Sequence, residues 1–571
     1  MEWMPPVCMK SWYIEVMRDT QMQAVIGIDF GTASGRAVVF DALTGRELGQ
    51  AVCPYPSGVE GVLPFPEEPQ AVRHDPRDYL FALERAVTGA LDAAEAGNPS
   101  FRRSEVRAIG VDSTGSSMIP LKADGSLLAD DPAFDGNPNA MLWLWKDHSA
   151  AGEAEEMTRR CAEEGNRFLR TTGGRCPVEM PWPRLLRLAR RDRRTFDAAY
   201  TWVELDDWIP FVLSGGGRAA SIARNKGGLA CKWMYREDLG GFPSDAFFAS
   251  LDQALVRIAH TFDPSRMLRV DETAGCLCAE WAKRTGLASG IPIAPGMFDG
   301  HAGGLGAGIR PGVLVETIGT SAVDLVLVPG SDPVPEIPGM FGVARDAIMP
   351  GAYLVEAGRS AVGDLLGWYV HDIAPKGLSF AELGEQAARL KPGQSGLLAL
   401  DWMNGNRSVF NDASLSGLVL GLTLRTKPEE IYRALVESTA FGARMILEQL
   451  ESNGHPVSSV IACGGIPRKN QLLVDIYANV LDREVSISRS TQTCALGAAV
   501  AASVVGGIWP SFPEAVSHMT GVLEESCRPR QADVDTYNRL FSRYRDLSLV
   551  FAEGKPANLG GLMAELRGLG K

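Results

Sequence analysis

Asp299 is the residue of this sequence with the clearest chemical potential. It lies in Gly296–Gly304, where several glycines surround a single carboxylate. Glycine lacks a Cβ and tolerates positive φ, so the backbone of such a segment can come close to a ligand. A carboxylate held there can act as a general base toward an alcohol. The competing interpretation is an ordinary turn, because Asp beside Gly is common in turns.

Two similar hairpin patterns flank this residue along the chain. Residues 25–40 and 313–328 each consist of an apolar strand, a small polar turn containing Gly-Thr, and a second apolar strand. Backbone N–H groups and hydroxyls at such a turn can hold a phosphate. Either pattern alone indicates a plain hairpin. Two related hairpins in the two halves predict a duplicated domain with phosphate held between the copies.

Length and composition agree with two globular domains. The chain has 571 residues, of which 45% are hydrophobic and 22% charged, enough for two cores of about 250 residues each. Its formal net charge of −13 disfavours nucleic acid as a partner, since binding would need a basic surface. The charge does not exclude ATP, which can be held locally by backbone donors and magnesium.

Several observations point to a cytoplasmic protein. The ten cysteines are scattered, and without a secretory signal they predict reduced thiols in the cytosol. Cys276 and Cys278 form a close pair, but no second pair or histidine cluster completes a zinc site. No apolar run is long enough to span a membrane. Residues 1–22 resemble neither a signal nor a transit peptide and are expected to be an irregular extension.

The apolar pattern alternates between strands and helices, which predicts an α/β fold. A buried strand over 106–112 runs into small polar residues at 113–117, at the kind of strand end where α/β sheets bind ligands. Neither a Walker sequence nor a dinucleotide-binding glycine fingerprint is present. Further strands are expected over 460–463 and 485–487. Helices are expected over about 76–95, 153–164, 183–191, 203–210, 427–451, 471–481 and 495–505.

Together these motifs resemble the FGGY carbohydrate kinases of the actin/hexokinase-like superfamily. The resemblance covers roughly residues 24–550 and is narrowest to the bacterial L-ribulokinases. The stretches that carry this narrower resemblance are residues 110–116, 137–140, 144–148, 354–364, 401–407 and 438–444.

The resemblance implies two actin-like (ribonuclease H-like) domains with a nucleotide and sugar cleft between them. The expected divisions are an extension at 1–22, an N-terminal domain at 23–300, a C-terminal domain at 301–550 and a tail at 551–571. The implied reaction is ATP- and Mg²⁺-dependent phosphorylation of the terminal hydroxyl of a ketopentose. L-ribulose would become L-ribulose 5-phosphate, as in L-arabinose catabolism. A homodimer is common among such kinases.

The resemblance also implies roles for individual residues. Asp299 would be the general base, and Asp29 would lie near the magnesium, through water. The residues implied at the nucleotide are Asp29, Gly31, Thr32, Ser34, Gly319, Thr320, Gly464, Gly465 and Asn470. The residues implied at the sugar are Gly115, Trp145, Lys146, Asp147, Lys232 and Glu356. Each has a structural alternative: Trp145 could be core, Lys146 and Asp147 a surface ion pair, and Glu356 a cap.

One departure from the ribulokinase pattern affects the choice of sugar. A lysine is usual three residues before the tryptophan that matches Trp233, but that position is Ala230, and Lys232 adjoins the tryptophan. This leaves D-ribulose, another ketose or a polyol as alternative substrates. Two other classes also stay open: an actin-like ATPase without a sugar, and a catalytically silent sugar sensor.

Overall fold

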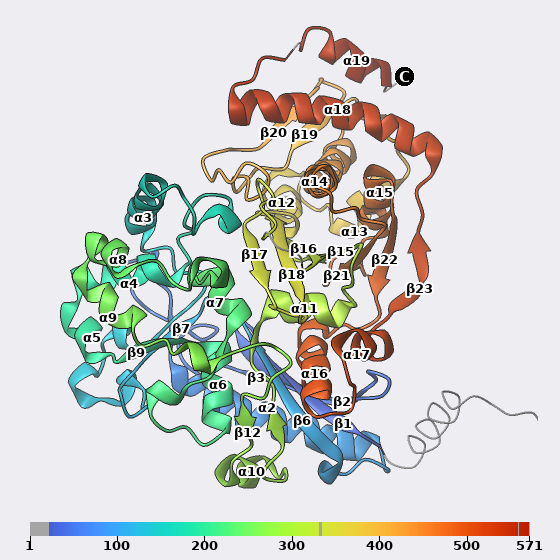
Figure 1. Ribbon diagram of the computed structural model, residues 1–571. Coiled ribbons are helices and arrows are strands. Elements are labelled where there is room, and N and C mark those ends of the chain that lie inside the picture. Colours follow the sequence, from blue (N-terminus) through green and yellow to red (C-terminus); the bar gives the residue numbers. More distant parts are fainter. Residues whose placement is uncertain (1–21, 331–333, 558, 570–571) are drawn as a thin grey trace, which may run out of the picture.

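The computed structural model describes residues 22–330, 334–557 and 559–569, so the extension expected at residues 1–22 lies almost entirely outside them. Two seven-stranded sheets form the centres of two lobes. One lobe lies in the lower part of Figure 1, around β1 and β6, and the other in the upper part, around β15 and β21. Both sheets are mixed, and both contain the same arrangement of strands.

The first sheet starts with the predicted hairpin. Strands β1 and β2 pair antiparallel, β2 continues to β3, and β6 lies parallel to β1 on its other side. The sheet is completed by three short strands near β6. Its strands are β1 (Ala24–Phe30), β2 (Ser34–Asp41), β3 (Glu47–Pro54), β6 (Val106–Ser113), β12 (Gly275–Cys276), β13 (Pro292–Ile293) and β14 (Met297–Phe298).

The second sheet repeats this order in the second half of the chain. Strands β15 and β16 pair antiparallel, β16 continues to β18, and β21 lies parallel to β15. This repetition confirms the predicted duplication. The strands are β15 (Val313–Ile318), β16 (Ala322–Pro329), β17 (Gly342–Arg345), β18 (Ala352–Arg359), β21 (Ser459–Cys463), β22 (Glu484–Ser488) and β23 (Val522–Cys527).

Helices α11 (Asp299–Ala307) and α16 (Thr493–Val505) lie between the two sheets (Figure 1). Glycines allow this close packing. A Cβ added to Gly27 of β1 would lie 1.8 Å from a carbonyl oxygen of α16, and one added to Gly497 would lie 1.8 Å from a carbonyl oxygen of α11. The outer face of the first sheet is covered by α2 (Pro76–Gly97), whose Leu83 shares a buried cluster with Ile26.

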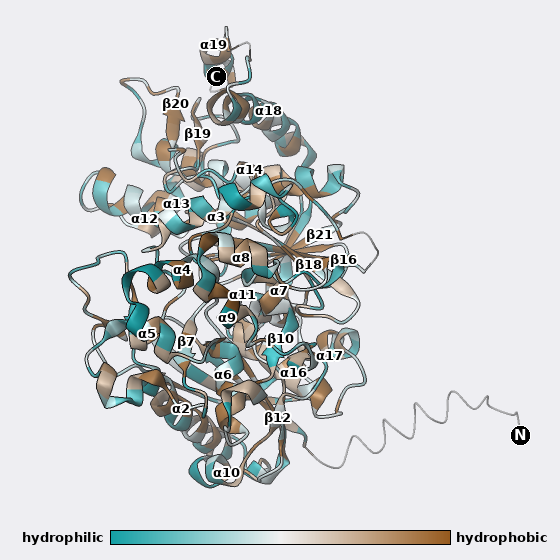
Figure 2. Ribbon diagram, turned by 60° about the vertical axis from the view of Figure 1, so that its left-hand side comes forward, coloured by the Kyte–Doolittle hydropathy of each residue, from teal (hydrophilic) through white to brown (hydrophobic). Residues whose placement is uncertain are grey.

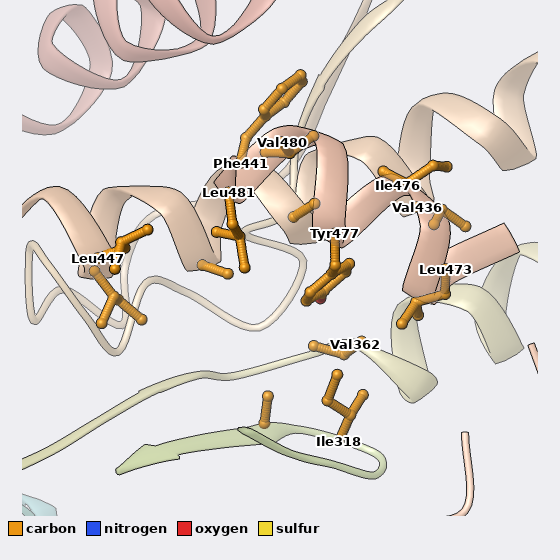
Figure 3. Close-up of a cluster of buried hydrophobic side chains, with 14 of the residues drawn as sticks. Ile318, Val362, Val436, Phe441, Leu447, Leu473, Ile476, Tyr477, Val480 and Leu481 are labelled. Carbon is orange, nitrogen blue, oxygen red and sulfur yellow. The ribbon is translucent and has the colours of Figure 1, made fainter. Parts of the chain in front are cut away.

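The outer face of the second sheet is covered by a large apolar cluster. Tyr477 and Leu473 of α15 (Gln471–Leu481) pack toward Ile318 of the sheet, beside Val436 of α14 (Pro428–Ser452) (Figure 3). Helix α18 (Gln531–Glu553) continues past the boundary predicted at 550, and α19 (Leu562–Leu569) follows it. The boundary predicted at 300 likewise falls inside α11.

A third, smaller sheet extends the N-terminal half on the left of Figure 1. Figure 2 shows hydrophilic residues on outer helices such as α5 (Arg193–Ala198), while hydrophobic residues fill the interior. No helix in the described part of the chain is long and apolar enough to cross a membrane. The third sheet contains β4 (Val62–Leu63), β5 (Arg73–His74), β7 (Met118–Leu121), β8 (Leu142–Trp143) and β9 (Thr201–Glu204).

Most predicted elements are present, with ends that differ by a few residues. The helix expected over 203–210 is preceded by β9 and begins at Leu205, as α6 (Leu205–Leu213). The interpretation of Gly296–Gly304 as a turn was wrong. Asp299 is the first residue of helix α11, and none of the glycines in this segment has a positive φ. Gly304 allows close packing, because a Cβ there would lie 2.6 Å from the Leu325 side chain. Two further predicted helices are α3 (Ala151–Glu163) and α4 (Pro181–Arg191).

Candidate active site

Three carboxylates meet at the carboxyl ends of neighbouring parallel strands. Asp29 of β1 is paired in register with Asp112 of β6. Met297 of β14 pairs with Asp112 as well, and Asp299 follows two residues later at the start of α11. The carboxyl edge of a sheet is where α/β proteins place ligands. The topology therefore brings the predicted base and the predicted magnesium residue into one group.

The electrostatics of this group favour proton acceptance by Asp299. Burial, and then the negative charge of Asp29, raise the pKa of Asp299 to about 6. Burial also raises the pKa of Asp29, although the Arg36 guanidinium, 3.6 Å away, acts in the opposite direction. A base whose pKa lies near the working pH transfers protons efficiently.

The first hairpin turn lies beside the predicted sugar region. Gly31 N–H donates to the Ser34 carbonyl at 3.1 Å and closes the turn. The indole N–H of Trp145 donates to the hydroxyl of Thr32 at 3.1 Å. Gly31, Thr32 and Ser34 are all partly exposed. A residue predicted at the sugar thus contacts a residue predicted at the phosphates.

The second hairpin turn caps another helix. Gly319 and Thr320 accept hydrogen bonds through their carbonyls from Gly363 and Val362, at 3.0 and 2.8 Å. These donors stand at the start of α12 (Gly363–Trp368). The turn and the first residues of α12 therefore form one rigid unit on the C-terminal lobe.

A cavity of about 800 Å³ opens in the C-terminal lobe, a size that suits a small-molecule ligand. Two of the predicted nucleotide residues, Gly465 and Asn470, line it. Asn470 also caps α15 by accepting from the Leu473 N–H. Gly464 does not line the cavity, but its φ of +96° requires glycine. Other lining residues include Gly363, Leu366, Phe380, Tyr432 and Ile466.

Glu356 and Lys232 lie in a buried cluster beside Asp299. Glu356 Oε1 receives a hydrogen bond from His301 Nε2 at 2.5 Å, and its other oxygen is 3.2 Å from the thiol of Cys231. Burial alone would raise the pKa of Glu356, but His301 and then Lys232 lower it to about 2. Glu356 therefore carries a full negative charge at neutral pH, close to the predicted general base Asp299.

The C-terminal lobe adds a cation to the same region. Arg407 lies 3.7 Å from the Glu179 carboxylate of the N-terminal lobe. The guanidinium of Arg407 is 4.3 Å, and the ammonium of Lys232 5.7 Å, from the ring centre of Phe341. Charged groups from both lobes thus converge at the cleft.

Gly115 packs against Phe298, the residue before Asp299. A Cβ on Gly115 would lie 2.0 Å from the Phe298 ring, so only glycine fits against this ring. The buried carboxylate of Glu204 accepts from the Ser117 N–H at 2.9 Å and from the Trp233 indole at 2.7 Å. Trp233 is fully buried, so its hydrogen bond helps to fix the position of Glu204.

Asp147 is held in a buried ion pair with Arg73. Its side chain is fully buried, one oxygen bonds to Arg73 and to the Val72 N–H, and the other accepts from Ser149. Arg73 in turn stacks 3.4 Å from the ring centre of Trp143. Both Asp147 oxygens are therefore engaged within the protein, and its contact with the sugar stays a prediction. The adjacent Lys146 is partly exposed.

Comparison with known proteins identifies the family. Residues 24–223 match the N-terminal domain of the FGGY family of carbohydrate kinases, and residues 314–505 match its C-terminal domain. The chain belongs to this family. It is 39% identical over 550 residues to a ribulokinase of Anoxybacillus flavithermus, covering 93% of this chain and 95% of that protein. A ribulokinase of Geobacillus thermodenitrificans matches equally, at 39% identity over the same coverage.

Solved structures confirm the fold. A xylulose kinase from Rhodospirillum rubrum superposes with a TM-score of 0.77 at 23% identity, over 92% of this chain and 99% of that one. A xylulose kinase from Lactobacillus acidophilus gives 0.78 at 18% identity, over 93% and 99%. The prediction of two actin-like domains is therefore confirmed. The prediction of a sugar phosphotransferase is confirmed by the FGGY family models and the ribulokinase relatives. The roles of individual residues and the domain boundaries stay predictions.

Sequence reasoning assigned no individual role to several residues in this region. Asp112 was noticed only as a polar strand end, although its pairing with Asp29 could have been inferred from two parallel strands. His301 lies two positions after Asp299 in α11 and contacts Glu356 of β18. Arg407 was noticed only within the resembling stretch 401–407, and Cys231 only as a neighbour of Ala230. Their proximity to each other and to Glu179 was not predicted, because it arises from segments far apart in the chain.

Proposed function

We propose that this protein transfers the γ-phosphoryl group of ATP to the terminal hydroxyl of a ketopentose, with L-ribulose as the first candidate. The observation that carries the proposal is the position of Asp299. It stands at the sheet edge between the two hairpins, beside the charged cluster of Glu356 and Lys232. Identity to ribulokinases over nearly the whole chain supports the choice of a ketopentose.

In this mechanism Asp299 accepts the proton of the sugar hydroxyl as the oxygen attacks phosphorus. Its pKa of about 6 keeps it mostly ionised at neutral pH. Glu356 accepts hydrogen bonds from neighbouring sugar hydroxyls, while Lys232 donates to a sugar oxygen. Trp145 links the sugar loop to Thr32 of the first hairpin and so helps align the two substrates, since phosphoryl transfer depends mainly on positioning.

The nucleotide would lie across the cleft. The adenosine occupies the cavity lined by Gly465 and Asn470, and the two hairpin turns hold phosphates. A divalent cation would be held near Asp29. Its carboxylate suits a divalent cation, because Arg36 neutralises the negative charge of Asp29 only in part. When bound, magnesium neutralises charge on the transferring phosphates.

The substitution at Ala230 bears on the sugar. Ala230 lines a separate cavity of about 300 Å³, together with Lys226 and Tyr235. Lys232, by contrast, acts electrostatically on Glu356. We therefore propose that Lys232 supplies the cation that position 230 supplies in the ribulokinase pattern. D-ribulose stays the second candidate, because the lysine approaches from a different backbone position.

ADP release from Mg-ATP, measured against L-ribulose, D-ribulose, xyluloses, hexuloses, pentitols and glycerol, tests the proposal. The highest kcat/KM is expected with L-ribulose. A preference for D-ribulose would show that the displaced lysine changed the specificity. ATP hydrolysis without any sugar would favour the actin-like ATPase, and sugar binding without turnover the silent sensor. A cytosolic location and a homodimer stay predictions.

A further inference from the structure

Asp112 is buried in a way that the proposed phosphoryl transfer does not yet explain. Its side chain is fully buried, and no N–H or O–H group among the described residues donates to either carboxylate oxygen; the Asp29 carboxylate can bond to it only if the two share a proton. Buried polar atoms are nearly always paired, because an unpaired one loses its hydration without compensation. A structure that keeps such a group at its reaction centre needs a partner for it.

The charged groups around Asp112 are carboxylates, which repel its carboxylate and do not pair with it. Asp29 on β1, Asp299 on α11 and Asp206 on α6 all place negative charge near it. Arg36 of β2 lies 3.6 Å from Asp29 and His301 acts on Asp299, so these positive charges are not placed on Asp112 itself. Four carboxylates share a partly buried site, so a bound cation would lower the energy of the whole group.

The distances suit one divalent cation. Ligand atoms of Asp29, Asp112 and Cys494 all lie within 4.8 Å of one another. Two oxygens that each bind Mg²⁺ at about 2.1 Å are at most about 4.2 Å apart. A small side-chain movement, or one bridging water, therefore places a cation between the two carboxylates. The Cys494 thiol is not expected to bind, because Mg²⁺ prefers oxygen ligands.

We propose that Asp112 acts together with Asp29 to hold the divalent cation that accompanies the nucleotide. This inference rests on the proposed function, since it concerns the metal of the same reaction. It adds a second carboxylate, from β6, to the single one that the sequence suggested. The parallel pairing of β1 with β6 aligns the two residues, so the sheet itself builds the site.

The test measures binding, not turnover. The affinity of the purified enzyme for ADP is determined by calorimetry with and without Mn²⁺, and the ratio of the two dissociation constants gives the coupling between metal and nucleotide. In Asp112→Asn this ratio should fall about 10- to 100-fold, a size typical of disturbed metal sites. Asp112→Ser, which removes the charge with a smaller side chain, should show the same loss.

Two matched controls separate the explanations. Asp206→Asn removes a negative charge from the same neighbourhood without removing a proposed ligand, and Cys494→Ala removes the thiol. Both ratios should remain near the wild-type value. An equal loss in Asp206→Asn would overturn the proposal in favour of a general effect of charge, and a loss in Cys494→Ala would point to a softer metal.

An unchanged ratio in both Asp112 variants would also overturn the proposal. Asp112 would then be a neutral carboxyl group hydrogen-bonded to Asp29. Thermal unfolding without metal or nucleotide checks folding, and Asp112→Asn should be at least as stable as wild type because a buried unpaired charge is gone. If the wild type binds Mn²⁺ and ADP but phosphorylates no sugar, the proposed function fails while the metal site stands.

Discussion

Replacing His301 by leucine should lower the stability of the protein and raise the KM for the sugar, because it removes the hydrogen bond from His301 to Glu356. The His301 and Glu356 side chains are 1% and 8% exposed, and the hydrogen bond between them is 2.5 Å long. Burial opposes ionisation of Glu356, yet His301 and Lys232 shift its pKa from 4.5 to about 2. That shift corresponds to about 3 kcal/mol in favour of the carboxylate.

The leucine variant loses the effect of His301, which is the largest of the effects that favour the Glu356 carboxylate. A hydrogen bond to a charged group contributes about 1.5–3 kcal/mol, so the free energy of unfolding at pH 7 should fall by about 2 kcal/mol. Since the folded pKa of Glu356 is depressed, its contribution is present above pH 4.5 and is lost as the pH falls toward 2. The difference between wild type and variant should shrink over that range.

Urea unfolding at several pH values, together with steady-state kinetics, measures these effects. The KM for the sugar should rise about tenfold, as loss of about 1.4 kcal/mol implies, with a smaller change in kcat. His301→Gln, whose amide can still donate to Glu356, should recover most of the loss. His518→Leu is the control, because His518 stacks on Trp509 at 4.2 Å and should not affect KM. A leucine variant with wild-type stability and KM would refute the reasoning.

Three further outcomes are expected. Because burial and then Asp29 raise the pKa of Asp299 to about 6, kcat/KM should fall about tenfold per unit as the pH drops below that value; a flat profile would argue against this base. Gly465→Val should raise the KM for ATP while the protein melts normally, since the space around that position is open; Gly464→Val, at a φ of +96°, should destabilise the fold. Gly497→Val should lower the melting temperature strongly, because its Cβ would lie 1.8 Å from the backbone of α11; a normal melt would contradict the packing.

The sequence predicted the elements whose patterns are local. The two hairpins, the strand at 106–112 and the helix after Pro428 were recognisable from apolar periodicity and from turn residues. Helix α11 was missed because glycines make it a poor helix by propensity. It forms because it is buried between the two sheets and α16, where packing outweighs propensity.

At the candidate site, too, residues with a local sequence pattern were predicted, and contacts between distant segments were not. Asp299 was recognisable because it stands among glycines, and Asp29, at the end of the first strand of a hairpin, because that hairpin resembles the family's motif. The alternative of a surface ion pair between Lys146 and Asp147 was wrong, because the partner of Asp147 is the buried Arg73, from a separate strand of the third sheet. His301 of α11 and Glu356 of β18 are 55 residues apart, and a single sequence carries no local signal for such a pair.

The most direct test of the whole account is Asp299→Asn, studied by sugar binding and by turnover. We expect the dissociation constant for the preferred ketopentose to stay near the wild-type value, because the amide keeps the size of the side chain. The kcat should fall roughly 10²- to 10⁴-fold, the usual contribution of a positioned general base. Near-normal turnover in this variant would remove Asp299 from the mechanism and contradict the account.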